Sequence, residues 1–241
     1  MTVSEARRSQ PVFVLIHSPL LGPKTWAPVA RGLGSRGRLA IVPSLLGLAR
    51  APSPQWRHIP QSVRAATAHV SDPIVLVGHS GAGPLLPAIA DAVPAGIAST
   101  IFADAFLPPG RGSAPLAPPA FMERLTALAE EGVLPPWSSW FGQDAMRELV
   151  PDDALRASVE RELPRLPLSY FEARVPVPDN WRRRRCTYLL FSPESYGPSA
   201  DEARDRGWPV AEMSAVGHLA MLTHPVAVTE ALLDLEREAA R

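Results

Sequence analysis

The chain has 241 residues, of which 46% are hydrophobic, so it holds enough apolar material for one domain with a sizeable core, spanning residues 1–241. Basic and acidic residues number 24 each, which excludes a charge-based reason for binding nucleic acid or an anionic membrane surface; we expect a small-molecule substrate as the partner. Cys186 is the only cysteine, which excludes an intramolecular disulfide and a cysteine-based zinc site and favours a cytoplasmic location.

The N-terminal residues 1–10 are expected to form a loose tail. The apolar stretch that follows, residues 11–16, is too short for the core of a secretion signal and leads directly into His17. No other segment of the sequence is long enough and apolar enough for us to expect a membrane span. The sequence leaves open whether the protein forms a homodimer.

Short runs rich in Val, Ile and Phe then alternate with longer segments of helical periodicity. This alternation is typical of an α/β fold, in which helices cover both faces of a mainly parallel sheet. We expect about six strands, over residues 12–17, 39–43, 74–78, 100–104, 187–192 and 210–213. The expected helices cover residues 25–34, 61–70, 82–92, 200–206 and 225–239. The loops that follow the strands should share one edge of the sheet, where ligands bind in such folds.

The regular alternation stops after the strand that ends at Asp104. The next segment is rich in proline, has no convincing strand, and shows helical patterns over residues 121–131 and 152–163. We interpret it as a helical cap over a pocket. The cap would cover residues 108–185, inserted into a core formed by residues 11–107 and 186–241. Its aromatic residues either touch the ligand or only attach the cap to the core, and the candidates for ligand contact are Trp137, Trp140 and Phe141.

The stretch IVLVGHSGAG, residues 74–83, is the most specific motif in the chain. A strand, a Gly-x-Ser-x-small turn and a helix follow one another, with Gly78, Ser80 and Ala82 at the key positions. This order is typical of a nucleophile elbow, whose sharp turn exposes the serine hydroxyl at the sheet edge. The alternative is an ordinary strand-to-helix turn that contains a serine by chance.

A serine hydroxyl is a weak nucleophile until a base accepts its proton, so a histidine is expected after the last strand. His218 lies there, and Gly217 gives its loop freedom to present the imidazole. His224 is the rival, although it adjoins a proline at the start of the final helix. Since the base is usually oriented by a carboxylate, two candidates remain for the third position, Asp104 and Glu194. We favour Asp104, because a carboxylate in an apolar run needs a partner, and keep Glu194 as the alternative.

Four motifs in this order resemble those of the α/β-hydrolase superfamily, in particular the small plant methylesterase and hydroxynitrile lyase group and related bacterial hydrolases. They are FVLIHSPLLGPKTW, LVGHSGAG, IFADAFLPPG and GHLAMLTHP. The resemblance implies that Ser80 is the nucleophile, His218 the base and Gly81 one oxyanion donor through its N–H. It also places Glu194 at the acid position of the plant enzymes, against our preference for Asp104.

Pro19 departs from this pattern, because it falls where the second oxyanion N–H is expected and has no N–H to donate. Losing one such donor can cost about 3 kcal/mol of transition-state stabilisation. Either the Ser18 hydroxyl or the Leu20 N–H would have to replace it. Ser18 also matches a hydroxyl residue that contacts the substrate in the lyases, and His79, beside the nucleophile, completes the set of expected site residues.

We therefore expect a cofactor-independent serine hydrolase, without a metal, that cleaves a small, largely apolar ester, thioester or lactone. The second hypothesis is a lyase, cyclase or decarboxylase that uses Ser80 and His218 as acid and base, and Pro19 motivates it. The third is a ligand-binding module on a hydrolase scaffold. Leu219 argues against a cyanohydrin lyase, since those lyases carry a lysine after the histidine.

Overall fold

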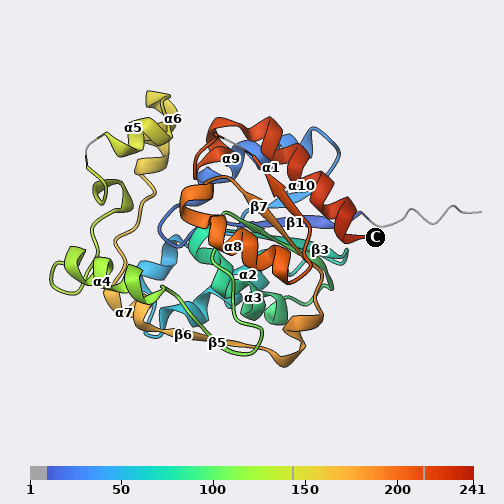
Figure 1. Cartoon of the computed structure of the whole chain (residues 1–241), viewed down its shortest axis with the longest axis horizontal. Helices are drawn as coiled ribbons and strands as arrows, with labels where there is room; N and C mark the ends of the chain where they lie inside the picture. Colours follow the sequence, from blue (N-terminus) through green and yellow to red (C-terminus); the bar gives the residue numbers. More distant parts are fainter. Residues whose placement is uncertain (1–9, 143, 214) are drawn as a thin grey trace, which may run out of the picture.

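The computed structural model describes residues 10–142, 144–213 and 215–241 (Figure 1). The tail expected over residues 1–10 therefore lies, apart from residue 10, outside the described residues. Within them, six strands form a parallel sheet in the order β2-β1-β3-β4-β7-β8. The strands are β1 Val12–Ile16, β2 Ala40–Ile41, β3 Ile74–His79, β4 Ile97–Ala103, β7 Cys186–Leu190 and β8 Val210–Glu212. This confirms the predicted α/β fold.

The central strands are buried because helices cover both faces of the sheet. Every residue of β1, β3 and β7 is buried, which explains why these strands appear in the sequence as unbroken apolar runs. Successive residues point to opposite faces: Leu76 joins one hydrophobic cluster, whereas Val75 and Val77 join the other. The sheet thus separates two halves of a single core.

Helices of the body pack on both faces. Helices α1 Ala27–Gly34, α9 Ala220–Thr223 and α10 Pro225–Ala239 contribute to the cluster that holds Val75, and they lie together in Figure 1. Helices α2 His58–Ala66, α3 Leu86–Ala92 and α8 Pro193–Asp205 contribute to the opposite cluster. Short 3₁₀ turns connect the elements: η1 Pro23–Thr25, η2 Leu46–Arg50, η3 Gln55–Arg57, η4 Ser80–Leu85, η5 Trp137–Ser139 and η6 Asp179–Arg183.

Two helix boundaries differ from the prediction for reasons that involve proline. Helix α8 begins at Pro193 rather than at residue 200, because a proline is well tolerated in the first turn; Pro198 inside the helix had hidden this start. The helix expected from residue 82 opens instead as the 3₁₀ turn η4, which contains Pro84. α-Helical geometry begins only at Leu86.

The cap region lies between β4 and β7 in the chain; its helices stand on the left in Figure 1, and its two strands run below the body. Its helices are α4 Pro119–Leu128, α5 Ala145–Leu149, α6 Asp153–Glu160 and α7 Leu168–Glu172. The expectation of no strand in this segment was wrong. Strand β5 Gly112–Pro115 pairs antiparallel with β6 Arg174–Val177. Both strands are short and contain a proline, so the local pattern GSAP or RVPV resembles a loop, and only their pairing across the cap makes them strands.

Candidate active site

Ser80 occupies a strained turn at the end of β3. Its φ of 56° lies in the left-handed region, which a side chain other than glycine seldom adopts. The neighbouring glycines make this turn sterically feasible. A Cβ at Gly78 would lie 2.6 Å from a methyl carbon of Leu86, and a Cβ at Gly83 would lie 2.0 Å from the carbonyl oxygen of Phe106. The geometry is therefore that of a nucleophile elbow, with the serine presented at the carboxyl edge of the sheet.

His218 and Asp104 are joined directly. His218 Nδ1 donates a hydrogen bond of 2.7 Å to Asp104 Oδ2. Because a carboxylate only accepts hydrogen bonds, Nδ1 carries the proton and Nε2 is left as a proton acceptor. This is the protonation state that a general base requires.

Asp104 is fully buried, yet its surroundings favour the carboxylate. The backbone N–H groups of Phe191 and Ser192 donate to Asp104 Oδ1 at 2.8 and 3.0 Å. Burial by itself raises the pKa of Asp104, but the hydrogen bond and charge of His218, with those two N–H groups, bring the pKa below its usual value. Asp104 also has a positive φ of 46°, so its backbone, like that of Ser80, is held in a strained conformation.

Glu194 lies elsewhere. It is exposed in the first turn of α8, where a carboxylate is favourable beside the helix N-terminus. No hydrogen bond or ion pair between described residues connects it to His218. The loop after β7 contributes to the site through the backbone N–H groups of Phe191 and Ser192, which donate hydrogen bonds to Asp104. The structure thus brings Asp104, and not Glu194, to the histidine.

Tyr196 is a site residue that the sequence analysis missed. Its Oη lies 3.1 Å from Ser80 Oγ, and its ring stacks on the imidazole of His218 with centroids 5.0 Å apart and planes at 8°. Between the described residues Ser80 and His218 themselves no direct hydrogen bond forms. The only sequence signal was an aromatic residue soon after a strand that ends at the ligand-binding edge, and this does not identify its contacts.

The loop after β1 faces Gly81. A Cβ placed on Gly81 would lie 3.6 Å from both Pro19 Cδ and Ser18 Oγ. The proline ring carbon therefore stands where an N–H would otherwise point. The N–H of Leu20 is directed to Ser18 Oγ at 3.4 Å, which leaves the Ser18 hydroxyl proton without an acceptor in the described part of the chain. Of the two expected substitutes, the Ser18 hydroxyl is thus the one available to a substrate oxygen.

Two buried histidines hold the loops of the site. Burial is the main cause that lowers the pKa of His79 well below its usual value, so it is neutral, and its Nε2 donates to the carbonyl of His218 at 3.0 Å. Burial likewise lowers the pKa of His17 to about 4. His17 Nδ1 donates to the carbonyl of Ser18, and Nε2 accepts from the N–H of Leu45. His79 does not line the cavity, so its place is behind His218 and not beside the substrate.

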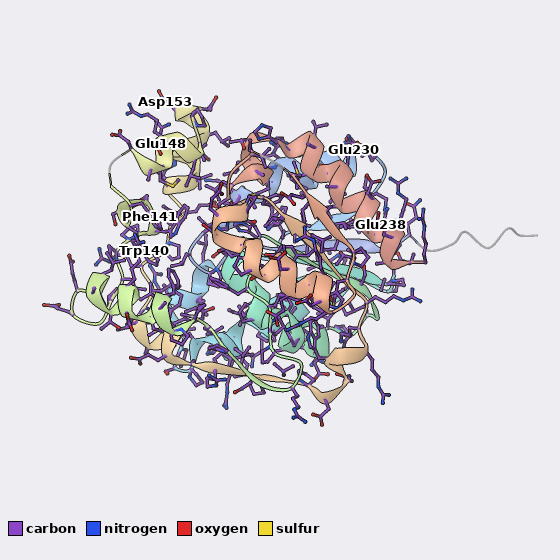
Figure 2. All side chains as sticks on the ribbon, viewed as in Figure 1. Trp140, Phe141, Glu148, Asp153, Glu230 and Glu238 are labelled. Atoms are coloured by element: carbon purple, nitrogen blue, oxygen red, sulfur yellow. The ribbon has the colours of Figure 1, made fainter. Side chains whose placement is uncertain are left out.

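A cavity of about 610 Å³ opens over Ser80 between the core and the cap. Its lining is mostly apolar and includes Ser18, Pro19, Leu20, Ser80, Gly81, Phe106, Leu116, Phe121, Trp137, Phe141, Ala145, Glu148, Leu149, Tyr170, Phe171, Ser195, Tyr196 and His218. Trp137 and Phe141 thus line the cavity, whereas Trp140 does not: it is buried in the cap, where its Nε1 donates to the carbonyl of Pro135. Trp140, Phe141 and Glu148 all belong to the cap (Figure 2).

Two absences hold for the described residues 10–142, 144–213 and 215–241. No group of three or more His, Cys, Asp or Glu side chains there is arranged to hold a metal ion. No helix there is both long enough and apolar enough to cross a membrane.

Several solved structures are similar in fold. An extracellular alpha/beta-hydrolase from a Paenibacillus species superposes with a TM-score of 0.73 at 18% identity, over 94% of this chain and 99% of that one. A pyrethroid hydrolase superposes with a TM-score of 0.74 at 17% identity, over 96% and 99%. A variant of tomato methylketone synthase I gives a TM-score of 0.71 at 17% identity, over 95% and 99%. Polyneuridine aldehyde esterase gives 0.69 at 18% identity, over 94% and 99%.

Identities this low establish a shared fold and not a shared activity. No curated protein matches the sequence. A sequence model of the alpha/beta hydrolase family, however, matches residues 13–231, which includes the elbow, the cap and the loop that carries His218. The chain belongs to the alpha/beta hydrolase family.

Proposed function

We propose that this protein is a serine hydrolase that cleaves a small, largely apolar ester, thioester or lactone through a Ser80–His218–Asp104 triad. The observation that carries the proposal is the 2.7 Å hydrogen bond from His218 to the buried Asp104, beside a serine in a strained elbow. This combination fixes the tautomer of the base and exposes the nucleophile, which are the two requirements of acyl transfer.

In the proposed reaction, Ser80 Oγ attacks the substrate carbonyl and its proton passes to His218 Nε2. His218 then protonates the departing alcohol, thiol or internal oxygen, which leaves an acyl group on Ser80. A water molecule, deprotonated by His218, attacks this acyl group, and Ser80 Oγ takes the proton back as it departs. Asp104 stabilises the imidazolium that forms in both halves, and the Gly81 N–H and the Ser18 hydroxyl donate to the carbonyl oxygen.

The lining of the cavity favours an apolar and uncharged substrate. Its described lining contains seven aromatic side chains, no Lys or Arg, and Glu148 as its single carboxylate, at the exposed rim on α5. An anionic substrate would therefore find no cationic partner there. A volume of about 610 Å³ falls in the range of sites for small molecules. The similar folds of a pyrethroid hydrolase and of polyneuridine aldehyde esterase are compatible with an ester substrate.

Pro19 favours one alternative. The proline ring lies where the second N–H is expected. A reaction that builds less charge on a carbonyl oxygen would therefore lose less transition-state stabilisation from the missing donor. Such a reaction is a lyase, cyclase or decarboxylase step in which Ser80 and His218 exchange protons with the substrate and form no acyl-enzyme. The similar fold of a methylketone synthase is compatible with this alternative.

A fluorophosphonate probe separates the two functions, because it phosphonylates a serine only when a base activates that serine for attack. We expect the folded protein to gain one probe adduct on Ser80, as detected by intact-mass and peptide mass spectrometry. Ser80→Ala is the matched control and should gain none. A folded wild-type protein that stays unlabelled would contradict the hydrolase proposal and favour the acid–base alternative.

A further inference from the structure

We infer that Tyr196 is a fourth catalytic residue, whose hydroxyl donates a hydrogen bond to Ser80 Oγ and stabilises that oxygen as the leaving group when the acyl-enzyme breaks down. The inference rests on the proposed hydrolase function. It concerns a contact with the reacting atom itself, since Tyr196 Oη lies 3.1 Å from Ser80 Oγ.

The direction of this hydrogen bond follows from the groups around it. Tyr196 is only 8% exposed, and Ser80 Oγ is the one partner found for its hydroxyl among the described residues. Burial raises the pKa of Tyr196, so the phenol keeps its proton at neutral pH. A buried O–H without an acceptor is costly, and donation from Tyr196 to Ser80 Oγ avoids that cost. This direction also leaves the proton of Ser80 free for His218.

The valence of Oγ accommodates all its partners at once. The oxygen carries one hydrogen and two lone pairs. One lone pair accepts from Tyr196 and the other remains for attack on the substrate carbonyl, while the hydrogen, which is not bonded to His218 in the resting structure, passes to His218 Nε2 during the attack. Because Asp104 fixes the proton of His218 on Nδ1, Nε2 is left to take the Ser80 proton in the reaction while Tyr196 donates to Ser80 Oγ.

The topology separates Tyr196 from the oxyanion side of the site. Ser18 and Pro19 follow β1, on one side of β3, whereas Tyr196 follows β7, beyond β4 on the other side. Ser80 at the end of β3 stands between them, and the substrate oxygen is expected on the side where Ser18 Oγ approaches Gly81. Tyr196 therefore acts on the nucleophile oxygen and does not replace the N–H that Pro19 lacks.

Such a donor has different effects on the two halves of the reaction. During acylation the C–Oγ bond forms, and Oγ uses its electron pair to attack. During deacylation the C–Oγ bond breaks, so negative charge builds on Oγ until it recovers a proton from His218. A hydrogen bond to an ionised oxygen is roughly twice as strong as one between neutral groups. The Tyr196 hydroxyl therefore lowers the barrier of deacylation more than that of acylation, while it keeps its own proton.

Tyr196→Phe tests this asymmetry, because it removes only the hydroxyl and keeps the ring that stacks on His218 and lies 5.2 Å from Phe106. Two rates are measured separately: labelling of Ser80 by a fluorophosphonate, which reports attack, and the decay of the acetyl-enzyme formed from p-nitrophenyl acetate, followed by intact mass. We expect decay about tenfold slower, the size of one hydrogen bond, with labelling nearly unchanged. In steady state, kcat and KM should then fall together once deacylation limits turnover.

Tyr188→Phe is the matched control. It also removes a buried tyrosine hydroxyl, but one that bonds to the backbone of Ala105 and not to Ser80. If Tyr188→Phe lowers activity at all, it should lower the rate of Ser80 labelling and the rate of acetyl-enzyme decay by the same factor. Equal loss of both rates in Tyr196→Phe, or an unchanged decay rate, would overturn the inference while leaving the hydrolase function intact. Failure of the wild-type protein to be labelled at all would contradict the proposed function itself.

Discussion

The side chains of the proposed triad come from the ends of three strands, and each is held by a different kind of contact. Ser80 depends on the strained elbow, His218 on its hydrogen bond to Asp104, and Asp104 on two backbone N–H groups from the loop after β7. Asp104 is therefore the residue on which the orientation of the base depends. Because Asp104 is buried, its carboxylate depends on His218 for stabilisation, just as His218 depends on Asp104 for its orientation.

Asp104→Asn tests this interdependence. The amide can still accept at Oδ1 but can also present an N–H to His218, which would stabilise the wrong imidazole tautomer. We expect kcat on a p-nitrophenyl ester to fall by up to about 10⁴-fold with the fold retained. Glu194→Gln, at an exposed carboxylate that makes no hydrogen bond or ion pair to His218 among the described residues, should remain close to wild type. The opposite pattern would return Glu194 to the acid position that the family resemblance implies.

At the scale of elements, the loop after β1 is where the proposed site departs from the oxyanion pattern that the family resemblance implies. The Trp26 Nε1–H donates to the carbonyl of Ile16 at 3.2 Å, and the Leu21 N–H donates to the carbonyl of Ser18 at 2.9 Å, so the loop is fixed at both ends. Within it, the buried Ser18 hydroxyl and the Pro19 ring both approach Gly81. This loop therefore offers a side-chain donor at the place where a backbone donor is missing.

Ser18→Ala and the double variant Ser18→Ala/Pro19→Ala test that exchange of donors. Removing the Ser18 hydroxyl should lower kcat on p-nitrophenyl esters by about 10²-fold, the usual cost of one oxyanion donor. The added Pro19→Ala restores a backbone N–H opposite Gly81, so we expect the double variant to regain part of the loss. A Ser18→Ala variant with full activity would show that the reaction needs no second donor, as in the acid–base alternative.

Local patterns were sufficient to predict the parallel sheet, the elbow and the histidine after the last strand, because each depends on a short stretch of sequence. Strands β5 and β6 were missed since their pairing joins residues on opposite sides of the cap. Tyr196 was missed for the same reason: its contacts with Ser80 and His218 link three segments that are distant in the sequence. The preference for Asp104 over Glu194 came from the cost of a buried charge, which is a physical argument that a local pattern can support.

At the scale of the whole molecule, the protein buries two neutral histidines under its active site. His17 and His79 are both fully buried, and burial lowers the pKa of each. In the unfolded chain a histidine has a pKa near 6.5 and takes up a proton below that pH, whereas folded His17 resists protonation down to about pH 4. The unfolded state thus binds more protons in this window, and the folded state loses stability as the pH falls.

We therefore expect the free energy of unfolding to decrease on acidification from pH 7 to pH 5, with about 2 kcal/mol of the decrease due to His17. Urea denaturation at pH 7 and at pH 5 measures this decrease in the free energy of unfolding. His17→Gln should cost stability at pH 7, where the hydrogen bonds to Ser18 and Leu45 are disturbed, but should show a smaller loss between pH 7 and pH 5. His69→Gln, at an exposed position, is the control for replacing a histidine by glutamine as such. An equal pH dependence in wild type and His17→Gln would show that folded His17 accepts a proton as readily as the unfolded chain.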